Sequence, residues 1–114
     1  MGGNAFRNTK RLTEKDYRKV CAEISKIFDK LSLCYGFPVE VGDKAELASN
    51  FGYQEPYGDV DVVVGYDGVH EQVVDTLQRQ IGEKEQERVK HGSTFSFLTK
   101  DFHQVDIKFV LKKI

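Results

Sequence analysis

The spacing of hydrophobic residues changes along this chain, and the change limits the possible folds more than any other feature. Between residues 14 and 32 they recur every three or four positions, which is the period of an amphipathic α-helix. In residues 104–111 they alternate with polar residues, as in a strand that buries one face. A chain with both periods is expected to pack helices against a sheet.

The remaining elements follow from the same reasoning. Thr13 and Asp16 have the spacing of a capping box at the start of the first helix, and Gly36 and Pro38 are expected to stop it. A second helix is expected from about residue 69 to 81. Strands are expected at 37–41, 60–64, 94–98 and 104–111, with a short strand at 46–48 and loops at 49–58 and 83–92. This order predicts an α/β (α+β) fold, with a mixed sheet of about four to five strands against two main helices.

Length and composition predict one soluble domain. A chain of 114 residues has room for a single core, so we expect one domain over 1–114, with residues 1–12 as a basic N-terminal arm. The 39% apolar and 31% charged residues exclude a disordered or fibrous chain. The sequence contains no secretory signal and no apolar run of about 18 residues, so a cytoplasmic protein without a membrane partner is expected.

The distribution of charge is uneven, although the net charge is only −1. Residues 39–75 carry nine acidic side chains and one basic side chain, Lys44, whereas both flanking segments are net basic. One interpretation is a cation site beside surfaces that meet a polyanion, such as a nucleic-acid acceptor. The other interpretation is a solvated acidic loop, and charge alone does not choose between them.

Three aspartates form the most informative pattern. Asp59 and Asp61 project from the same face of the strand at 60–64, and Asp106 lies on the polar face of the last strand. If these strands are neighbours, three carboxylates converge, and a divalent cation with oxygen ligands relieves their repulsion. The alternative is a solvated strand face. Asp and Gly are poor strand formers, however, and they open the most hydrophobic strand of the chain.

These motifs resemble the DNA polymerase beta-type nucleotidyltransferase superfamily. The resemblance rests on the run from Leu47 to Val64, which ends in Gly-Asp-Val-Asp-Val-Val-Val, and on Gln-Val-Asp-Ile-Lys-Phe-Val at 104–110. The opening Gly-Gly-Asn-Ala-Phe-Arg-Asn-Thr-Lys-Arg-Leu also resembles the start of small nucleotidyltransferase-like proteins of phage genomes. Together the similar segments span nearly the whole chain. A phage origin would place the protein in the host cytoplasm.

The resemblance implies a nucleotidyltransferase-like fold and a Mg²⁺- or Mn²⁺-dependent activity. Such enzymes transfer a nucleoside monophosphate from a nucleoside triphosphate to an acceptor hydroxyl. By resemblance, Asp59 and Asp61 are paired metal ligands, and Asp106 is a third acid that also helps to activate the hydroxyl. The family's Gly-Ser, which contacts the phosphates, maps onto either Ala48-Ser49 or Ser49-Asn50, and Gly52 is expected to restore the turn there. The candidate residues for the nucleotide and its phosphates are thus Ser49, Asn50, Gly52 and Gly58, with Lys108.

The chain departs from the superfamily pattern in two places. Ala48 or Ser49 stands where the family has glycine, and a Cβ there hinders close approach to a phosphate. The given sequence also stops eight residues after Asp106, without the additional helical domain of many catalysing members. We expect a minimal catalytic domain, a fragment, a chain whose partner supplies the rest, or a protein that no longer catalyses. These departures motivate an alternative function, a weak or inactive binding or assembly module that needs a protein partner or an oligomer to supply a second domain. A metal-dependent phosphodiesterase is a third, weaker alternative.

Lys108 lies on the same face of its strand as Asp106. Its side chain has two possible roles: it can contact a phosphate, or it can form an ion pair that reduces the charge of the acidic cluster. Two roles are also open for the basic residues Arg7, Lys10 and Arg11. They can bind a triphosphate or an acceptor strand, or they can form a solvated basic arm.

Overall fold

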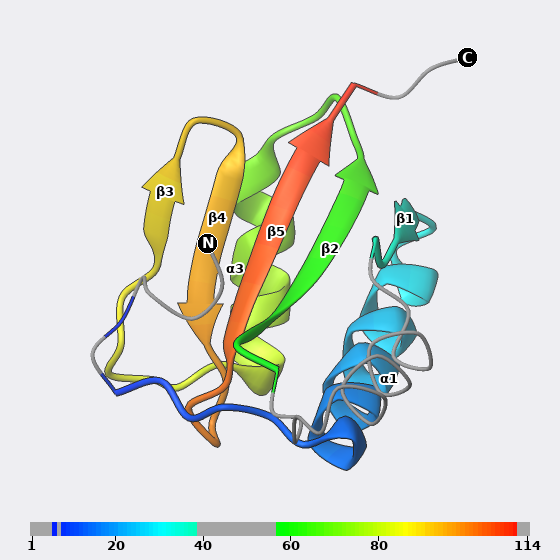
Figure 1. The fold of residues 1–114 in the computed structure, drawn as a ribbon. Helices are drawn as coiled ribbons and strands as arrows, with labels where there is room; N and C mark the ends of the chain where they lie inside the picture. The colour runs from blue at the N-terminus through cyan, green and yellow to red at the C-terminus, as the bar shows by residue number, and fades with distance from the viewer. Residues whose placement is uncertain (1–5, 7, 39–56, 112–114) are drawn as a thin grey trace.

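The computed structural model describes residues 6, 8–38 and 57–111. Within these ranges two helices pack on one side of a five-stranded mixed sheet, as Figure 1 shows, which confirms the expected fold class. The arrangement is consistent with a nucleotidyltransferase-like fold. The elements are α1 (Glu14–Lys30), β1 (Cys34–Gly36), β2 (Asp59–Gly65), α3 (His70–Ile81), β3 (Val89–His91), β4 (Thr94–Leu98) and β5 (Gln104–Val110).

The strand order in the sheet differs from the order in the sequence. The spatial order is β1-β2-β5-β4-β3, so the last strand lies between β2 and β4. The β2 and β5 strands are parallel, whereas the other three neighbouring pairs are antiparallel. The sheet therefore places 59–65 directly beside 104–110, although these segments are far apart in the sequence.

One face of the sheet forms the hydrophobic core with the helices. Val60, Val62 and Val64 of β2 are at most 1% exposed, because every second residue of the strand points to the helix side. The helices contribute their apolar stripes, including Ile24 and Phe28 from α1. No helix in the described part of the chain is long and apolar enough to cross a bilayer.

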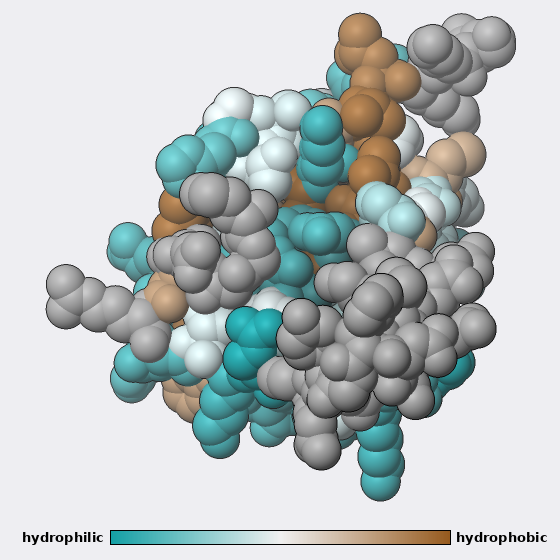
Figure 2. Space-filling view, in the orientation of Figure 1, coloured by the Kyte–Doolittle hydropathy of each residue, from teal (hydrophilic) through white to brown (hydrophobic). Residues whose placement is uncertain are grey.

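The opposite face of the sheet carries the polar residues of β2 and β5. Figure 1 shows α3 behind the sheet, so this polar face is turned towards the viewer. In the same orientation, Figure 2 shows hydrophilic side chains near the centre of this face and hydrophobic ones where β2 and β5 end. Two exposed apolar residues at that end are Val110 and Leu111.

The N-terminal segment crosses the other end of the sheet, where β2 and β5 begin. The Lys10 amide donates to the Phe102 carbonyl at 2.7 Å, and Leu12 and Tyr57 exchange two backbone hydrogen bonds. Leu12 is fully buried, and the Tyr57 ring packs against the Tyr17 ring. These contacts fix the chain just before Asp59.

The first helix ends two residues earlier than the sequence predicts, and Gly36 and Pro38 do not end it. Ser32 adopts a left-handed backbone with φ of 56°. Its amide donates to the Asp29 carbonyl, and the Leu33 amide donates to the Phe28 carbonyl, each at 3.1 Å. This pair of bonds is a Schellman motif, which normally uses glycine at the left-handed position. Because serine rather than glycine occupies this position, the local sequence did not predict where the helix ends.

The short strands at the two sheet edges differ from the sequence prediction. Residues 34–36 form β1, whereas the strand was expected at 37–41, of which 39–41 lie outside the described residues, as does the strand expected at 46–48. Residues 89–91 form β3 within the segment expected to be a loop. A two-residue turn begins at Gly92, with φ of 58°, and brings His91 opposite Thr94. Both β1 and β3 form because they pair with the longer strands β2 and β4. A short stretch of sequence does not contain that information.

Candidate metal centre

The three aspartates converge on the polar face of the sheet. Asp61 of β2 lies opposite Asp106 of β5 in the parallel register, and Asp59 lies two residues before Asp61 on the same face. Each carboxyl offers one oxygen, and these oxygens all lie within 4.8 Å of one another. The sequence predicted this convergence on the condition that the two strands are neighbours, and the strand order meets that condition.

Burial, together with the neighbouring carboxyls, keeps a proton on Asp59. Desolvation and a hydrogen bond to Asp106, followed by repulsion from Asp61, raise the pKa of Asp59 to about 7. A carboxylic acid ordinarily ionises near pH 4, so the cluster holds a proton that isolated aspartates would lose. A cation between the carboxylates would replace this proton.

Asp106 is held by two donors from the sheet. The Ser96 hydroxyl donates to Asp106 Oδ1 at 2.6 Å, and the Gln104 side-chain amide donates to the same oxygen at 2.9 Å. Ser96 lies opposite Asp106 on β4, and Gln104 precedes it by two residues on β5. Both residues are buried, with 6% and 1% of their surfaces exposed. The carboxyl orientation is therefore fixed before any ligand arrives.

Tyr17 of α1 lies near enough to the cluster to interact with the charges of Asp61 and Asp59. Burial raises the pKa of its phenol, and the nearby charges of Asp61 and Asp59 add to the shift. The phenol therefore stays protonated at neutral pH and keeps a hydroxyl near the carboxylates. The sequence predicted Tyr17 only as part of the hydrophobic stripe of the helix.

The donor set fits a hard divalent cation. Three carboxylates on neighbouring strands provide oxygen ligands with enough negative charge to compensate a double positive charge. All three side chains are partly exposed, so an ion from solvent can reach them. Asp59, Asp61 and Asp106 could thus hold a metal ion.

The other predicted nucleotide-binding residues are only partly placed. Ser49, Asn50 and Gly52 lie outside the described residues. Gly58 directly precedes β2 and therefore adjoins Asp59. Lys108 is exposed on the same face as Asp106 and lies between Thr94 of β4 and Val63 of β2.

Lys108 is not joined by an ion pair to the acidic cluster in the described part of the chain. No ion pair joins it to an acidic side chain there, so the interpretation as an ion-pair partner gains no support from these residues. Its neighbours across the strands, Thr94 and Val63, carry no charge. Its ammonium group is available to an anion bound near the carboxylates.

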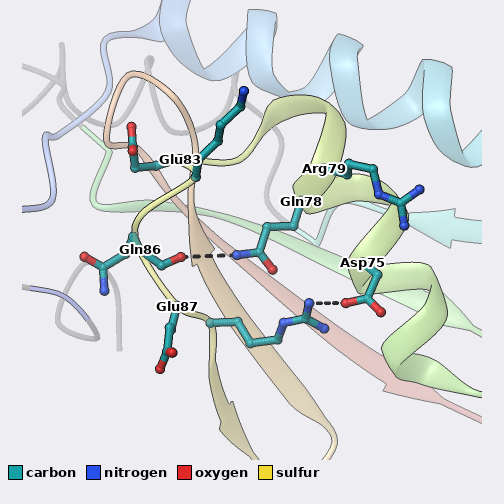
Figure 3. Close-up of a pocket in the computed structure, with 8 residues that line it drawn as sticks. Asp75, Gln78, Arg79, Glu83, Gln86 and Glu87 are labelled. Carbon is teal, nitrogen blue, oxygen red and sulfur yellow. Dashed lines mark hydrogen bonds and ion pairs between the residues drawn. The ribbon is translucent and has the colours of Figure 1, made fainter.

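A second charged hollow lies away from the aspartates, between the end of α3 and residues 83–88 (Figure 3). Arg88 forms an ion pair with Asp75, and the Gln78 side-chain amide donates to the Gln86 carbonyl at 3.3 Å, which ties this segment to the helix. Acidic and basic side chains are mixed along its walls. Because α3 covers the opposite face of the sheet, this hollow is separate from the three aspartates.

Sequence reasoning missed Ser96 and Gln104 as parts of the site. Gln104 could have been found, because a residue two positions before Asp106 shares its face. Ser96 could not, because its position opposite Asp106 depends on the register between β4 and β5. Comparison with protein-family models gives no match for this chain, and comparison with curated proteins gives no significant relative.

Proposed function

We propose that this protein is a Mg²⁺-dependent nucleotidyltransferase that transfers a nucleoside monophosphate from a nucleoside triphosphate to an acceptor hydroxyl. The observation that carries the proposal is the pairing of Asp61 with Asp106 in parallel register, with Asp59 beside them. The same three positions carry the resemblance to the polymerase beta-type superfamily. Mg²⁺ and Mn²⁺ both suit this donor set.

In this proposal the three carboxylates have different tasks. Asp59 and Asp61, together with Asp106, would hold the metal ion, which when bound would neutralise phosphate charge and polarise the phosphoryl group. Asp106 also accepts the proton of the attacking hydroxyl, since its carboxyl is already oriented by Ser96 and Gln104. The hydroxyl oxygen bonds to the α-phosphorus as the bond to the β-phosphate breaks, and pyrophosphate leaves. Lys108 binds a phosphate oxygen on the same face. Gly58 and the segment with Ser49, Asn50 and Gly52 complete the phosphate contacts.

A binding or assembly module is the second candidate. It is favoured by the Ala48-Ser49 departure from the family pattern and by the exposed apolar residues Val110 and Leu111 at the end of β5. In that case a protein partner or a second copy would cover the apolar end, and the chain would transfer no nucleotide.

A thermal-shift panel separates the two candidates. The eight common ribonucleoside and deoxyribonucleoside triphosphates would be tested with and without Mg²⁺. The samples would be the natural chain, an Asp59→Asn/Asp61→Asn variant and an Asp67→Asn variant as a control for charge alone. A nucleotide at 100 times its dissociation constant stabilises a protein by about 2.7 kcal/mol, which is a shift of several degrees here.

The proposal predicts a Mg²⁺-dependent shift for at least one nucleotide in the natural chain and in Asp67→Asn. The double variant is expected to lose the shift, because it lacks two of the three carboxylates. If no nucleotide shifts the natural chain, the nucleotidyltransferase proposal is wrong and the assembly module becomes the better account. Hydrolysis of a nucleic acid without a triphosphate donor would instead indicate a phosphodiesterase.

A further inference from the structure

The two hydrogen bonds that Asp106 accepts from Ser96 and Gln104 arrive at one oxygen atom. Ser96 Oγ and Gln104 Nε2 both donate to Oδ1, at 2.6 Å and 2.9 Å. Two donors on one oxygen oppose the approach of a cation to it, so a metal is expected at Oδ2.

The two donors are themselves fixed in the sheet. Ser96 sits in the middle of β4, and Gln104 begins β5, with β4 on one side and β2 on the other. Burial of Gln104 to 1% exposure gives its amide little freedom to turn away. A buried amide and hydroxyl would each lose free energy without a partner, so this arrangement resists rearrangement when a metal binds.

From this geometry we propose that Ser96 and Gln104 are positioning residues that restrict Asp106 to a single-oxygen ligand and thereby favour Mg²⁺ or Mn²⁺ over Ca²⁺. Mg²⁺ requires a near-octahedral set of single oxygens, whereas Ca²⁺ accepts more ligands and often takes both oxygens of one carboxylate. With Oδ1 occupied, Asp106 cannot supply the two-oxygen contact that Ca²⁺ would use. The inference rests on the proposed metal-dependent function and adds to it a structural source of metal preference.

The test is calorimetric titration of the nucleotide-free protein with MnCl₂ and, separately, with CaCl₂. The variants are Ser96→Ala, Gln104→Leu and the combination of both. Ser96→Thr is the conservative rescue because it retains the hydroxyl. Thr94→Ala is the matched control, since it removes a hydroxyl from the same face of β4 at a residue that pairs with Lys108 rather than with Asp106. Circular dichroism and thermal unfolding check that each variant is folded.

Removal of both donors is expected to weaken Mn²⁺ binding by about 10- to 100-fold, as is usual for partners that orient metal ligands. Ca²⁺ binding is expected to fall less, because the freed Oδ1 becomes available to it, so the preference for Mn²⁺ decreases. Ser96→Thr and Thr94→Ala should retain both the affinity and the preference. If Gln104→Leu does not fold, Ser96→Ala alone tests the inference. It should then lower both the Mn²⁺ affinity and the preference for Mn²⁺ over Ca²⁺.

Two results overturn the inference in distinguishable ways. An unchanged Mn²⁺ affinity or an unchanged preference over Ca²⁺ in the folded donor variants shows that Ser96 and Gln104 do not position Asp106, while the metal site itself stands. Absence of Mn²⁺ binding to the natural chain overturns the inference together with the proposed function.

Discussion

At the scale of single residues, repulsion among three carboxylates decides how the site behaves without a metal. The effect falls on Asp59, because desolvation, its hydrogen bond to Asp106 and the charge of Asp61 raise the pKa of this carboxyl to about 7. The unfolded chain has no such crowding, so there Asp59 ionises near its ordinary value of 3.8. Between these two values the folded state holds a proton that the unfolded state has lost.

This difference predicts a pH dependence of stability. Stability from the retained proton is fully present below about pH 4 and is lost as the pH rises through about 7. In metal-free buffer, Asp59→Asn should therefore gain stability relative to the natural chain as the pH rises across this range. Urea unfolding at several pH values measures the difference.

The control for the pH experiment is Asp67→Asn, which removes an exposed carboxylate outside the cluster. Its stability relative to the natural chain should stay constant over the same range. If the stability difference between Asp59→Asn and the natural chain also stays constant over this pH range, Asp59 does not retain a proton in the folded state.

At the scale of elements, α1 depends on a capping box at its start. The Thr13 hydroxyl accepts a hydrogen bond from the Asp16 amide at 3.1 Å, and the Asp16 carboxylate accepts one from the Thr13 amide at 3.2 Å. Thr13→Ala should lower the free energy of unfolding by about 1 kcal/mol, because an amide of the first turn loses its acceptor. Thr13→Ser keeps the acceptor and should cost much less. Equal losses in the two variants, measured by urea unfolding, would argue against the cap.

The elements show which parts of the fold are readable from sequence. The capping box and the alternation in β5 are local patterns, and both were predicted within a residue or two. The two edge strands and the end of α1 depend on pairing or on an unusual backbone at Ser32, which local patterns do not encode. Helices and central strands are therefore readable, whereas edges and caps without glycine are not.

The candidate site divides in the same way. Asp59 and Asp61 are recognisable from one strand, because two residues at alternate positions share a face. Asp106 joins them only if β5 lies beside β2. The sequence analysis stated this as a condition, and the strand order of the sheet meets it. Ser96 required the register of a third strand, and no single segment contains that information.

At the scale of the whole molecule, the sheet separates the acidic cluster from a hollow of mixed charge. The three aspartates occupy the face without helices among the described residues, and the mixed-charge hollow beside α3 lies on the helix side. Divalent cations are attracted to negative charge in general, so each region is a possible place for weak binding. In the hollow, however, the Asp75 carboxylate is already paired with Arg88. Among the described residues, specific binding is therefore expected at the three aspartates and not in the hollow.

Paramagnetic broadening by Mn²⁺ tests this central claim most directly. Substoichiometric Mn²⁺ would be added to the ¹⁵N-labelled chain while its backbone amide signals are recorded. We predict that signals of residues 59–61 and 104–107 broaden first, that those of 83–88 persist, and that Asp61→Asn loses the effect. Broadening centred on 83–88, or the same broadening with and without Asp61, would contradict a metal centre at the three aspartates.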